Sequence, residues 1–348
     1  MKNSQLILLA TVLLFCALTA QAQSARHDFD KVDKSLEDVL MYEKIGDVAY
    51  ISKLRLTGPA KANVKPTGNA FDDQFLGNDL VFRAYVFIPK TTQQNRKYPV
   101  VVFPHGGIHG TFATGYAPFV RELMAQGYLV IAPDYRGSTG YGKGFYQAID
   151  YGGRENEDAL ACAKYMVNSY EIVDPKRVAI VGWSHGGMIA LMNALQFPDT
   201  YACAFAGVPV SDVSYRLEYM DSSYSKEFSA SYHIGKLPAE VPQEYARRSP
   251  VSYAKHLRIP LLINTTENDD DVSYKEVSRM IDSLKAYNKE FEYKIYPPMP
   301  GAHIFDRIDT PEAVDIRYQT HQFLARYLSP PTPFRSVKDM RRAAYYYY

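Results

Sequence analysis

Two patterns of apolar positions divide the chain into a leading part and a main part. Over residues 48–56 and 80–88 apolar and polar positions alternate, which predicts two antiparallel edge strands joined by a loop rich in Gly, Pro and Asn. After Pro99, short apolar runs alternate with helical periodicity, which is typical of an α/β protein with a mostly parallel sheet covered by helices. The predicted strands are the buried runs 100–103, 128–132 and 178–181, then 202–208, 260–264 and a last strand 292–296. The predicted helices are 118–126, 157–168, 188–195 and 275–287.

Three segments depart from this alternation. Residues 23–45 are polar and predict a loose segment with a short helix over 36–42. Residues 211–255, rich in Tyr, Ser and charge and interrupted by prolines, predict a small cap over the carboxyl ends of the strands. The stretch after Pro330 has no periodicity and predicts a surface arm or disorder. We therefore divide the chain into a leader 1–22, an extension with edge strands 23–95, a main domain 96–330 that carries the cap 211–255, and a tail 331–348.

The first 22 residues have a composition of their own. Lys2 precedes an apolar run over residues 6–18, and Ala20-Gln21-Ala22 has the small-x-small pattern of a cleavage site. The run is too short to cross a membrane comfortably, and an uncleaved anchor is the alternative interpretation. The pattern predicts a secretory signal peptide cut after Ala22, and hence a secreted or periplasmic protein with no membrane span after cleavage.

Composition narrows the possible partners. With 348 residues, 47% of them hydrophobic, the chain can bury a sizeable core. Removing the leader takes away Lys2 and leaves 38 basic and 38 acidic residues, a balance that argues against nucleic acid as a partner. Of the cysteines that remain, Cys162 and Cys203 fall in apolar patterns, so two buried free thiols are favoured over one disulfide. The oligomeric state stays open.

Residues 177–191 combine a buried strand, a glycine-flanked turn and a helix, with Ser184 at the apex. Gly182 and Gly186 flank the serine because a sharp strand-to-helix turn leaves no room for β-carbons beside it. The turn exposes the serine hydroxyl at a helix N-terminus, where N–H groups and the helix dipole favour the negative charge of acyl transfer. A plain strand–helix turn is the alternative. The apolar runs on both sides favour a nucleophile elbow.

A serine nucleophile needs a histidine to take its proton and an acid to orient that histidine. Behind such an elbow the acid and then the histidine follow on loops after later strands. Asp269 follows the strand 260–264 and is the preferred acid, while Asp270 and Asp271 remain candidates beside it. His303 follows the strand 292–296 and is the predicted general base.

The loop after the strand 100–103 predicts the remaining part of the chemistry. It reads His105-Gly106-Gly107, and its glycines let backbone N–H groups approach a substrate. The N–H groups of Gly107 and His185 are therefore the predicted oxyanion hole. His105 and His109 could instead indicate a metal, but no H-E-x-x-H motif or second cluster accompanies them, so no metal site is predicted.

Residues 137–144 nearly fit a phosphate-binding loop, G-x-x-x-x-G-K-[ST]. Gly144 stands at the last position and has no hydroxyl to hold magnesium. The sequence thus predicts neither a nucleotide nor any other cofactor.

Over roughly residues 80–328 these segments together resemble the catalytic domain of the prolyl oligopeptidase family of serine peptidases. The similar motifs are His105-Gly-Gly107, Asp134-Tyr-Arg-Gly-Ser-Thr-Gly-Tyr-Gly142, Asp174-Pro-Lys-Arg-Val178, Gly182-Trp-Ser-His-Gly-Gly187 and Ser249-Pro-Val251. The resemblance implies an α/β-hydrolase fold, and the family's Asp-x-x-Val pattern selects Asp269 over its neighbours through Val272. The chain departs from the family pattern by one residue inserted between Gly301 and His303, and by Ile108 and Thr266 where proline and glycine are frequent.

The resemblance implies an enzyme that cleaves peptide bonds through an acyl-enzyme formed on Ser184. Residues 23–95 are too few for the β-propeller that filters peptides in the larger family members, which leaves the substrate open. A carboxylesterase acting on small or sugar esters is the alternative, because both activities use one acyl-enzyme route. A non-catalytic binding protein on the same fold is the alternative of a different class.

Overall fold

The computed structural model describes residues 25–60 and 79–344. The predicted signal peptide, most of the loop between the two edge strands, and residues 345–348 lie outside the described residues. No helix within the described ranges combines the length and the apolar character needed to cross a membrane.

An eight-stranded sheet organises the described part of the chain in the order β1-β2-β4-β3-β5-β6-β7-β8. Its first two pairings are antiparallel and all others are parallel. The strands are β1 Ala49–Gly58, β2 Leu80–Pro89, β3 Tyr98–Val102, β4 Leu129–Asp134, β5 Val173–Trp183, β6 Cys203–Gly207, β7 Leu261–Thr266 and β8 Glu292–Tyr296. This arrangement confirms the predicted mostly parallel sheet with an antiparallel edge.

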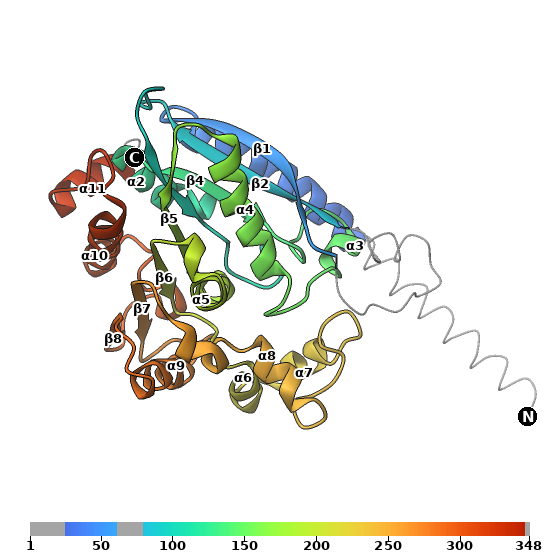
Figure 1. Ribbon diagram of the computed structural model, residues 1–348. Coiled ribbons are helices and arrows are strands. Elements are labelled where there is room, and N and C mark those ends of the chain that lie inside the picture. The colour runs from blue at the N-terminus through green and yellow to red at the C-terminus, as the bar shows by residue number, and fades with distance from the viewer. Residues whose placement is uncertain (1–24, 61–78, 345–348) are drawn as a thin grey trace, which may run out of the picture.

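The sheet has a hydrophobic cluster on each face. Successive side chains of a strand point to opposite sides and so enter different clusters. Val100 and Val102 belong to one hydrophobic cluster, whereas Val101 and Phe103 belong to a second. The first cluster includes side chains of α4 Glu155–Ser169, α5 His185–Gln196 and α9 Tyr274–Ala286. The second includes side chains of α2 Ala117–Gln126 and α10 Pro311–Leu328. Helices thus cover the sheet on two sides (Figure 1), as continuous apolar strands require.

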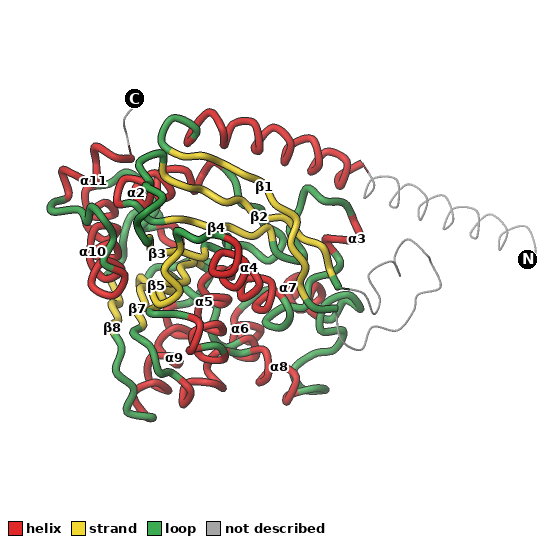
Figure 2. The backbone as a smooth tube through the Cα atoms, turned by 45° about the horizontal axis from the view of Figure 1, so that its top comes forward, coloured by secondary structure: helices red, strands yellow, loops and turns green. Residues whose placement is uncertain are grey.

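The N-terminal extension is more ordered than its sequence indicates. The chain is helical over residues 25–45, so the prediction of a loose segment with a short helix over 36–42 was wrong. Figure 2 shows this helix lying along β1. Met41 and Ile45 are fully buried, and the Lys34 ammonium donates to the carbonyl of Phe112 at 2.6 Å. This helix therefore docks through two apolar side chains and through a buried lysine that is hydrogen-bonded to the main domain.

The predicted cap consists of short helices. These are α6 Val213–Tyr219, α7 Ser222–Phe228, α8 Pro242–Arg248 and a 3-10 segment Pro250–His256. The carboxylates of Asp212 and Asp221 accept backbone N–H groups at the starts of α6 and α7, and Pro242 opens α8. Figure 1 shows the three α-helices grouped on the side of α5 and α9.

The tail is also folded, contrary to the predicted surface arm. Residues Val337–Ala344 form α11, and Met340 is fully buried beside Phe334 and Val314 of α10. The Thr332 hydroxyl donates to the carbonyl of Ala125 in α2 at 2.8 Å. The sequence did not reveal this helix because it is short and half of its eight residues are charged.

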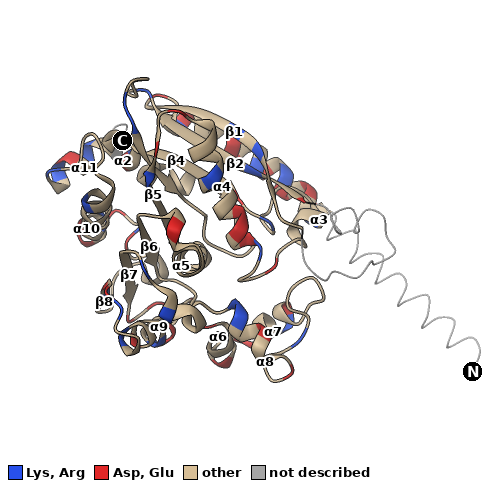
Figure 3. Ribbon diagram, in the orientation of Figure 1, with Lys and Arg blue, Asp and Glu red and all other residues tan. Residues whose placement is uncertain are grey.

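Two further features bear on the predictions made from composition. Cys162 and Cys203 are free and buried, as the apolar patterns around them predicted. Residues 137–144 lead into α3 Lys143–Tyr146 and pack against the N-terminal helix, where a Cβ on Gly140 would lie 2.4 Å from that of Lys34. Figure 3 shows acidic and basic residues interspersed over the elements, which fits a chain with almost no net charge.

Candidate active site

Ser184 stands at the turn between β5 and α5 in a backbone conformation that side-chain-bearing residues rarely adopt. Its φ is 59° and its ψ is −122°. The Ser184 N–H donates to the carbonyl of Gly207 at 2.9 Å, and its own carbonyl accepts from the Val210 N–H at 3.3 Å. Such strain persists only where the surrounding structure fixes it. The geometry is that of a nucleophile elbow.

Close backbone packing explains the two glycines of the elbow. A Cβ on Gly182 would lie 2.2 Å from the carbonyl oxygen of Gly186. A Cβ on Gly186 would lie 2.4 Å from the carbonyl oxygen of Pro104. Neither position has room for a side chain, and the second contact seats the elbow against the loop that follows β3.

The loop after β3 brings backbone donors to the same place. Gly107 has a φ of +74°, a conformation that favours glycine. The neighbouring Gly106 N–H donates to the Tyr116 hydroxyl at 2.8 Å and is therefore occupied. Within the described ranges the N–H groups of Gly107 and His185 make no hydrogen bond, and both residues line one cavity with Ser184. Two donors of this kind can bind a developing oxyanion.

His105 supports this loop from inside the protein. Its side chain is fully buried, its ring stacks on Tyr135 at 4.2 Å, and its Nε2 lies 2.8 Å from the Ser138 hydroxyl oxygen. Burial lowers the pKa of His105 to about 4, so the imidazole is neutral near pH 7. The Tyr135 hydroxyl donates to the Gly107 carbonyl at 2.7 Å. His105 and Tyr135 thus hold the glycine loop in position.

Asp269 and His303 meet on the loops that follow β7 and β8. Both carboxylate oxygens of Asp269 lie 2.9 Å from Nδ1 of His303. The N–H groups of Asp271 and Val272 donate to Asp269 Oδ1 at 2.9 and 2.8 Å. The Asp269 side chain is fully buried, whereas 15% of the His303 side chain is exposed. A buried carboxylate on Nδ1 leaves Nε2 as the ring nitrogen that can exchange a proton.

The three adjacent acids make different contacts. Asp270 accepts the backbone N–H of His303 at 3.4 Å. Asp271 forms an ion pair with Arg216 at 2.5 Å, and its Oδ2 lies 3.8 Å from Nε2 of His303. These contacts distinguish Asp269 from Asp270 and Asp271, which their positions in the chain alone did not do.

Arg216 is a site residue that sequence reasoning missed. It comes from α6 in the cap, is 2% exposed, and lines the cavity beside Ser184. Besides the Asp271 carboxylate, it donates to the Asp271 carbonyl at 3.0 Å and so ties the cap to the acid loop. No motif marks this arginine among the other charged residues of the cap.

The predicted residues fall into two contacting groups. Ser184, Gly107 and His185 line one cavity, and Asp269 contacts His303. In the described part of the chain no hydrogen bond joins Ser184 to His303. Nucleophile–base contacts are often long without substrate and tighten when substrate binds.

His321, a further histidine after Asp269, lies in α10 away from this cavity. Its Nε2 is 2.9 Å from a carboxylate oxygen of Glu122 and its Nδ1 is 2.9 Å from Gln126 Nε2. It is fully buried and does not line the cavity. His321 is therefore a structural side chain, which leaves His303 as the histidine at the predicted place.

The cavity has a volume of about 640 Å³, within the usual range of small-molecule sites. One side is formed by Gly107, Ser184 and His185 at the ends of the strands. Cap residues also line the cavity, among them Tyr224, Glu227 and Tyr232. Its walls mix aromatic rings with charged groups, so it suits a substrate with both apolar and polar parts.

The fold and the elbow define a class of protein: an α/β-hydrolase of the serine hydrolase type. Within that class the chain belongs to the prolyl oligopeptidase family, whose model matches residues 117–328. The family match covers the elbow, the cap, and both loops that carry Asp269 and His303.

Among curated proteins, the chain is similar to the acylamino-acid-releasing enzyme of Mus musculus, with 30% identity over 223 residues. That match covers 63% of this chain and 30% of the mouse protein. Dipeptidyl aminopeptidase BIII of Pseudoxanthomonas mexicana is 27% identical over 255 residues, covering 70% of this chain and 36% of that protein. The chain thus spans about a third of the length of these relatives.

Solved structures show the same fold. An acylaminoacyl peptidase in complex with Z-Gly-Gly-Phe-chloromethyl ketone matches with a TM-score of 0.67 and 20% identity, covering 86% of this chain and 45% of that one. A puromycin-hydrolyzing peptidase of Mycobacterium tuberculosis matches with a TM-score of 0.65 and 26% identity, covering 80% of this chain and 39% of that one. These likenesses confirm the predicted α/β-hydrolase fold.

Proposed function

We propose that the protein hydrolyses peptide bonds through an acyl-enzyme on Ser184, with His303 as general base and Asp269 as its orienting acid. The observation that carries the proposal is the buried Asp269 carboxylate, both of whose oxygens lie 2.9 Å from His303 Nδ1. This contact orients the imidazole so that its Nε2 lies on the side of Asp271. Asp271 and Ser184 line the same cavity.

The chemistry proceeds in two half-reactions. His303 Nε2 takes the Ser184 proton as the serine oxygen attacks the carbonyl carbon, and the Gly107 and His185 N–H groups stabilise the resulting oxyanion. The protonated imidazole then gives its proton to the leaving amine. Water, deprotonated by the same imidazole, releases the acyl group and restores Ser184.

Relatives favour an amide over an ester as the bond that is cleaved. The names of the similar proteins, an acylamino-acid-releasing enzyme and a dipeptidyl aminopeptidase, describe the release of terminal residues from peptides. The cavity of about 640 Å³ is large enough for a few residues of a peptide. We therefore propose a short peptide as the substrate class.

We further propose that the protein is exported and that residues 1–22 are removed after Ala22. The proposal rests on the apolar run and the cleavage pattern of the leader. It is tested by expressing the full chain and determining the N-terminus of the mature protein in each cell fraction. Cytoplasmic protein that retains Met1 and the leader would contradict it.

The nucleophile is tested with a fluorophosphonate probe. The wild-type protein should be labelled and Ser184→Ala should not, while circular dichroism shows the same fold for both. Ser252→Ala, at an exposed serine outside the cavity, is the matched control and should be labelled like the wild type. Continued labelling of Ser184→Ala would show that the nucleophile lies elsewhere.

The bond preference is tested by comparing kcat/KM over a panel of peptide anilides, aryl esters and acylated sugars. A peptidase should turn over one or more anilides with an N-terminal acyl group or a free amine. Turnover confined to esters would favour the carboxylesterase alternative. The absence of both turnover and probe labelling would favour a binding protein.

A further inference from the structure

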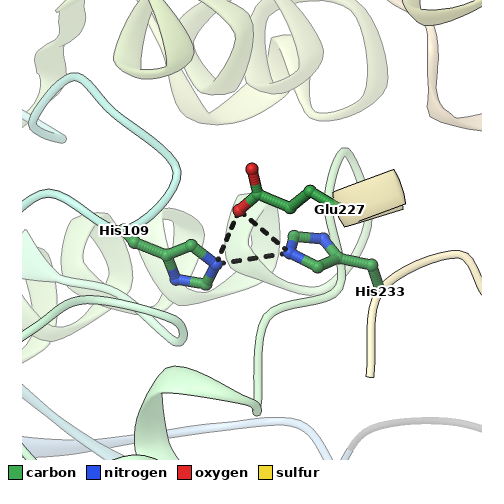
Figure 4. Close-up of side chains that lie close together, drawn as sticks. All are labelled: His109, Glu227 and His233. Atoms are coloured by element: carbon green, nitrogen blue, oxygen red, sulfur yellow. Dashed lines mark hydrogen bonds and ion pairs between the residues drawn. The ribbon is translucent and has the colours of Figure 1, made fainter. Parts of the chain in front are cut away.

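Three side chains from two distant parts of the chain point at one another beside the cavity that contains Ser184: His109, Glu227 and His233 (Figure 4). The two Nε2 atoms of His109 and His233 are 3.2 Å apart. Glu227 Oε1 lies 3.6 Å from the first and 3.7 Å from the second. In the described ranges this is the one group of three His, Cys, Asp or Glu side chains whose ligand atoms all lie within 4.8 Å of one another.

The group joins the cap to the main domain. His109 lies on the loop after β3, two residues beyond Gly107, whereas Glu227 belongs to α7 and His233 to the turn that follows it. His109 and Glu227 both line the cavity that contains Ser184. A ligand held by this group would therefore connect the predicted oxyanion loop to the cap.

The hydrogen bonding of His109 defines which of its nitrogens is free. Its Nδ1 donates to the carbonyl of Gly137 at 2.7 Å, which requires the proton on Nδ1 and leaves the lone pair on Nε2. The ring also stacks on Tyr146 with centroids 3.5 Å apart. A backbone carbonyl that accepts from one ring nitrogen and a free lone pair on the other are typical of metal-binding histidines.

His233 and Glu227 complete the set of donors. The His233 side chain is fully buried, and its ring is held by contacts with Phe228 and Tyr232 at 5.6 and 4.8 Å. Its Nδ1 has no hydrogen-bond partner among the described residues. About a third of the Glu227 side chain is exposed, and Glu227 lines the cavity.

The distances match those of a metal coordination shell. Metal–ligand bonds of about 2.1 Å at tetrahedral angles hold the ligand atoms about 3.4 Å apart. The observed separations of 3.2, 3.6 and 3.7 Å are close to that value on all three sides of the triangle. One cation near its centre would contact all three atoms without any large movement of the side chains.

Hydrogen bonding alone explains the cluster less well. A proton on His233 Nε2 could be donated to His109 Nε2, and this would account for the shortest of the three distances. It would leave the Glu227 carboxylate beyond hydrogen-bond distance of both rings. A cation uses the carboxylate and both lone pairs at once.

We propose that His109, Glu227 and His233 form a binding site for a divalent transition-metal cation of the Zn²⁺ type. Two imidazoles and one carboxylate select Zn²⁺, Co²⁺ or Ni²⁺ over Mg²⁺ and Ca²⁺, which prefer oxygen ligands. Three protein ligands leave a fourth position open for water or a substrate oxygen. The proposal goes beyond peptide hydrolysis and does not depend on it.

Metal binding is measured directly, without substrate. Protein stripped with a chelator is titrated with Zn²⁺ against a chromophoric competitor, and one equivalent should bind. His109→Gln, His233→Gln and Glu227→Gln should each weaken binding by about tenfold or more. The exposed His256 lies outside the cavity, so His256→Gln should bind like the wild type. No stoichiometric binding, or equal binding by all four variants, would overturn the proposal.

Two further measurements separate this site from other causes of the same result. Co²⁺ bound by the wild type should give the intense visible absorption of four-coordinate cobalt with nitrogen ligands, and the ligand variants should lose it. If His233→Gln fails to fold, Glu227→Gln, at a partly exposed position, still decides the question. Ser184→Ala should bind Zn²⁺ like the wild type, so a failed peptidase assay would leave this test intact.

Discussion

The wall of the cavity that carries Ser184 and the wall formed by the cap are built from different kinds of structure. We call Gly107, Ser184 and His185 the core wall, and the cap residues Tyr224, Glu227 and Tyr232 the cap wall. The core wall lies at the ends of β3 and β5 over an apolar interior. The cap wall comes from α7, which has seven residues, and from the turns beside it.

This difference predicts that the core wall serves the chemical step and that the cap wall selects the substrate. In the core wall each reactive group is held by neighbours that are themselves buried, such as Tyr135 under the Gly107 carbonyl. In the cap wall, side chains of Tyr224 and Tyr232 are only partly buried. We therefore expect substitutions in the core wall and its supports to change kcat or stability, and substitutions in the cap wall to change KM.

The largest expected effect lies in the support of His303. Asp269→Asn removes the negative charge on Nδ1 and favours the wrong imidazole tautomer, so kcat should fall by about 10⁴-fold. The measurement is steady-state hydrolysis of a peptide anilide, with circular dichroism to verify the fold. Asp270→Asn is the matched control, and its kcat should stay near that of the wild type. Equal losses in both variants would show that the acid is not specifically Asp269.

The next effect tests a buried ion pair of the main domain. Arg136 and Asp158 are fully buried, and the guanidinium donates two hydrogen bonds to the carboxylate at 2.7 and 2.8 Å. Arg136→Met leaves the carboxylate buried without its partner and should lower the free energy of unfolding by about 3–5 kcal/mol, measured by urea denaturation. The exposed pair of Arg326 with Glu292 is the control. Arg326→Met should cost at most about 1 kcal/mol, and a cost as large as that of Arg136→Met would contradict the distinction.

A smaller effect follows from the pKa of His105, which burial lowers from 6.5 to about 4. Between these values the unfolded chain binds a proton that the folded protein does not, so stability is full above pH 6.5 and falls as the pH approaches 4. The loss from this group should be about 3 kcal/mol. Urea denaturation at a series of pH values should show a shallower decline for His105→Gln. His256→Gln, at an exposed position, should keep the wild-type slope, and an unchanged slope in His105→Gln would refute the assignment.

The smallest effect is expected in the cap wall. Tyr232→Ala removes an aromatic ring from the cavity lining without touching Ser184, Asp269 or His303. KM for a peptide substrate should rise by up to about tenfold while kcat changes little, because the lost contact acts equally on bound substrate and transition state. Tyr287→Ala, at a half-exposed tyrosine outside the cavity, should leave both constants unchanged. A large fall in kcat for Tyr232→Ala would place the cap in the chemical step.

The main domain could be predicted from the sequence because its strands are buried on both faces. Continuous apolar runs such as Val178–Val181 leave little choice of structure, and the turn residues after them locate the loops. The prediction for Ser184 rests on such a strand, whereas His303 follows β8, most of whose residues are exposed. Periodicity thus reveals an element when the whole element contacts the core.

The N-terminal helix and α11 were missed because few of their side chains are buried in the core. In α11 the buried apolar side chain is Met340, and in the N-terminal helix a charged residue, Lys34, occupies one of the buried positions. Both helices carry apolar side chains at helical spacing, Val337, Met340 and Ala343 in α11 and Phe29, Val32 and Leu36 in the N-terminal helix. However, α11 has only eight residues, and these apolar side chains of the N-terminal helix are exposed instead of facing the core. Tertiary contacts fold both segments, and these contacts cannot be read from the segments themselves.

Long-range groupings were missed as well. His109 was considered as a metal ligand and set aside because no second cluster lies near it in the chain. Its partner His233 is 124 residues away and is brought to it by the fold of the cap. Arg216 and Asp271, 55 residues apart, are a second pair of this kind. Where a cap folds over a sheet, spacing along the chain says little about such groups.

The backbone hydrogen bonds of Ser184 set a limit on how the cap could be exchanged by protein engineering. Ser184 is joined to Gly207 and Val210, the last residues before the cap begins at residue 211. A chimera that replaces the chain from Gly207 onward would rebuild the hydrogen-bond partners of Ser184 together with the cap. Grafts from other family members should therefore start after Val210, so that a new specificity is introduced onto an unaltered elbow.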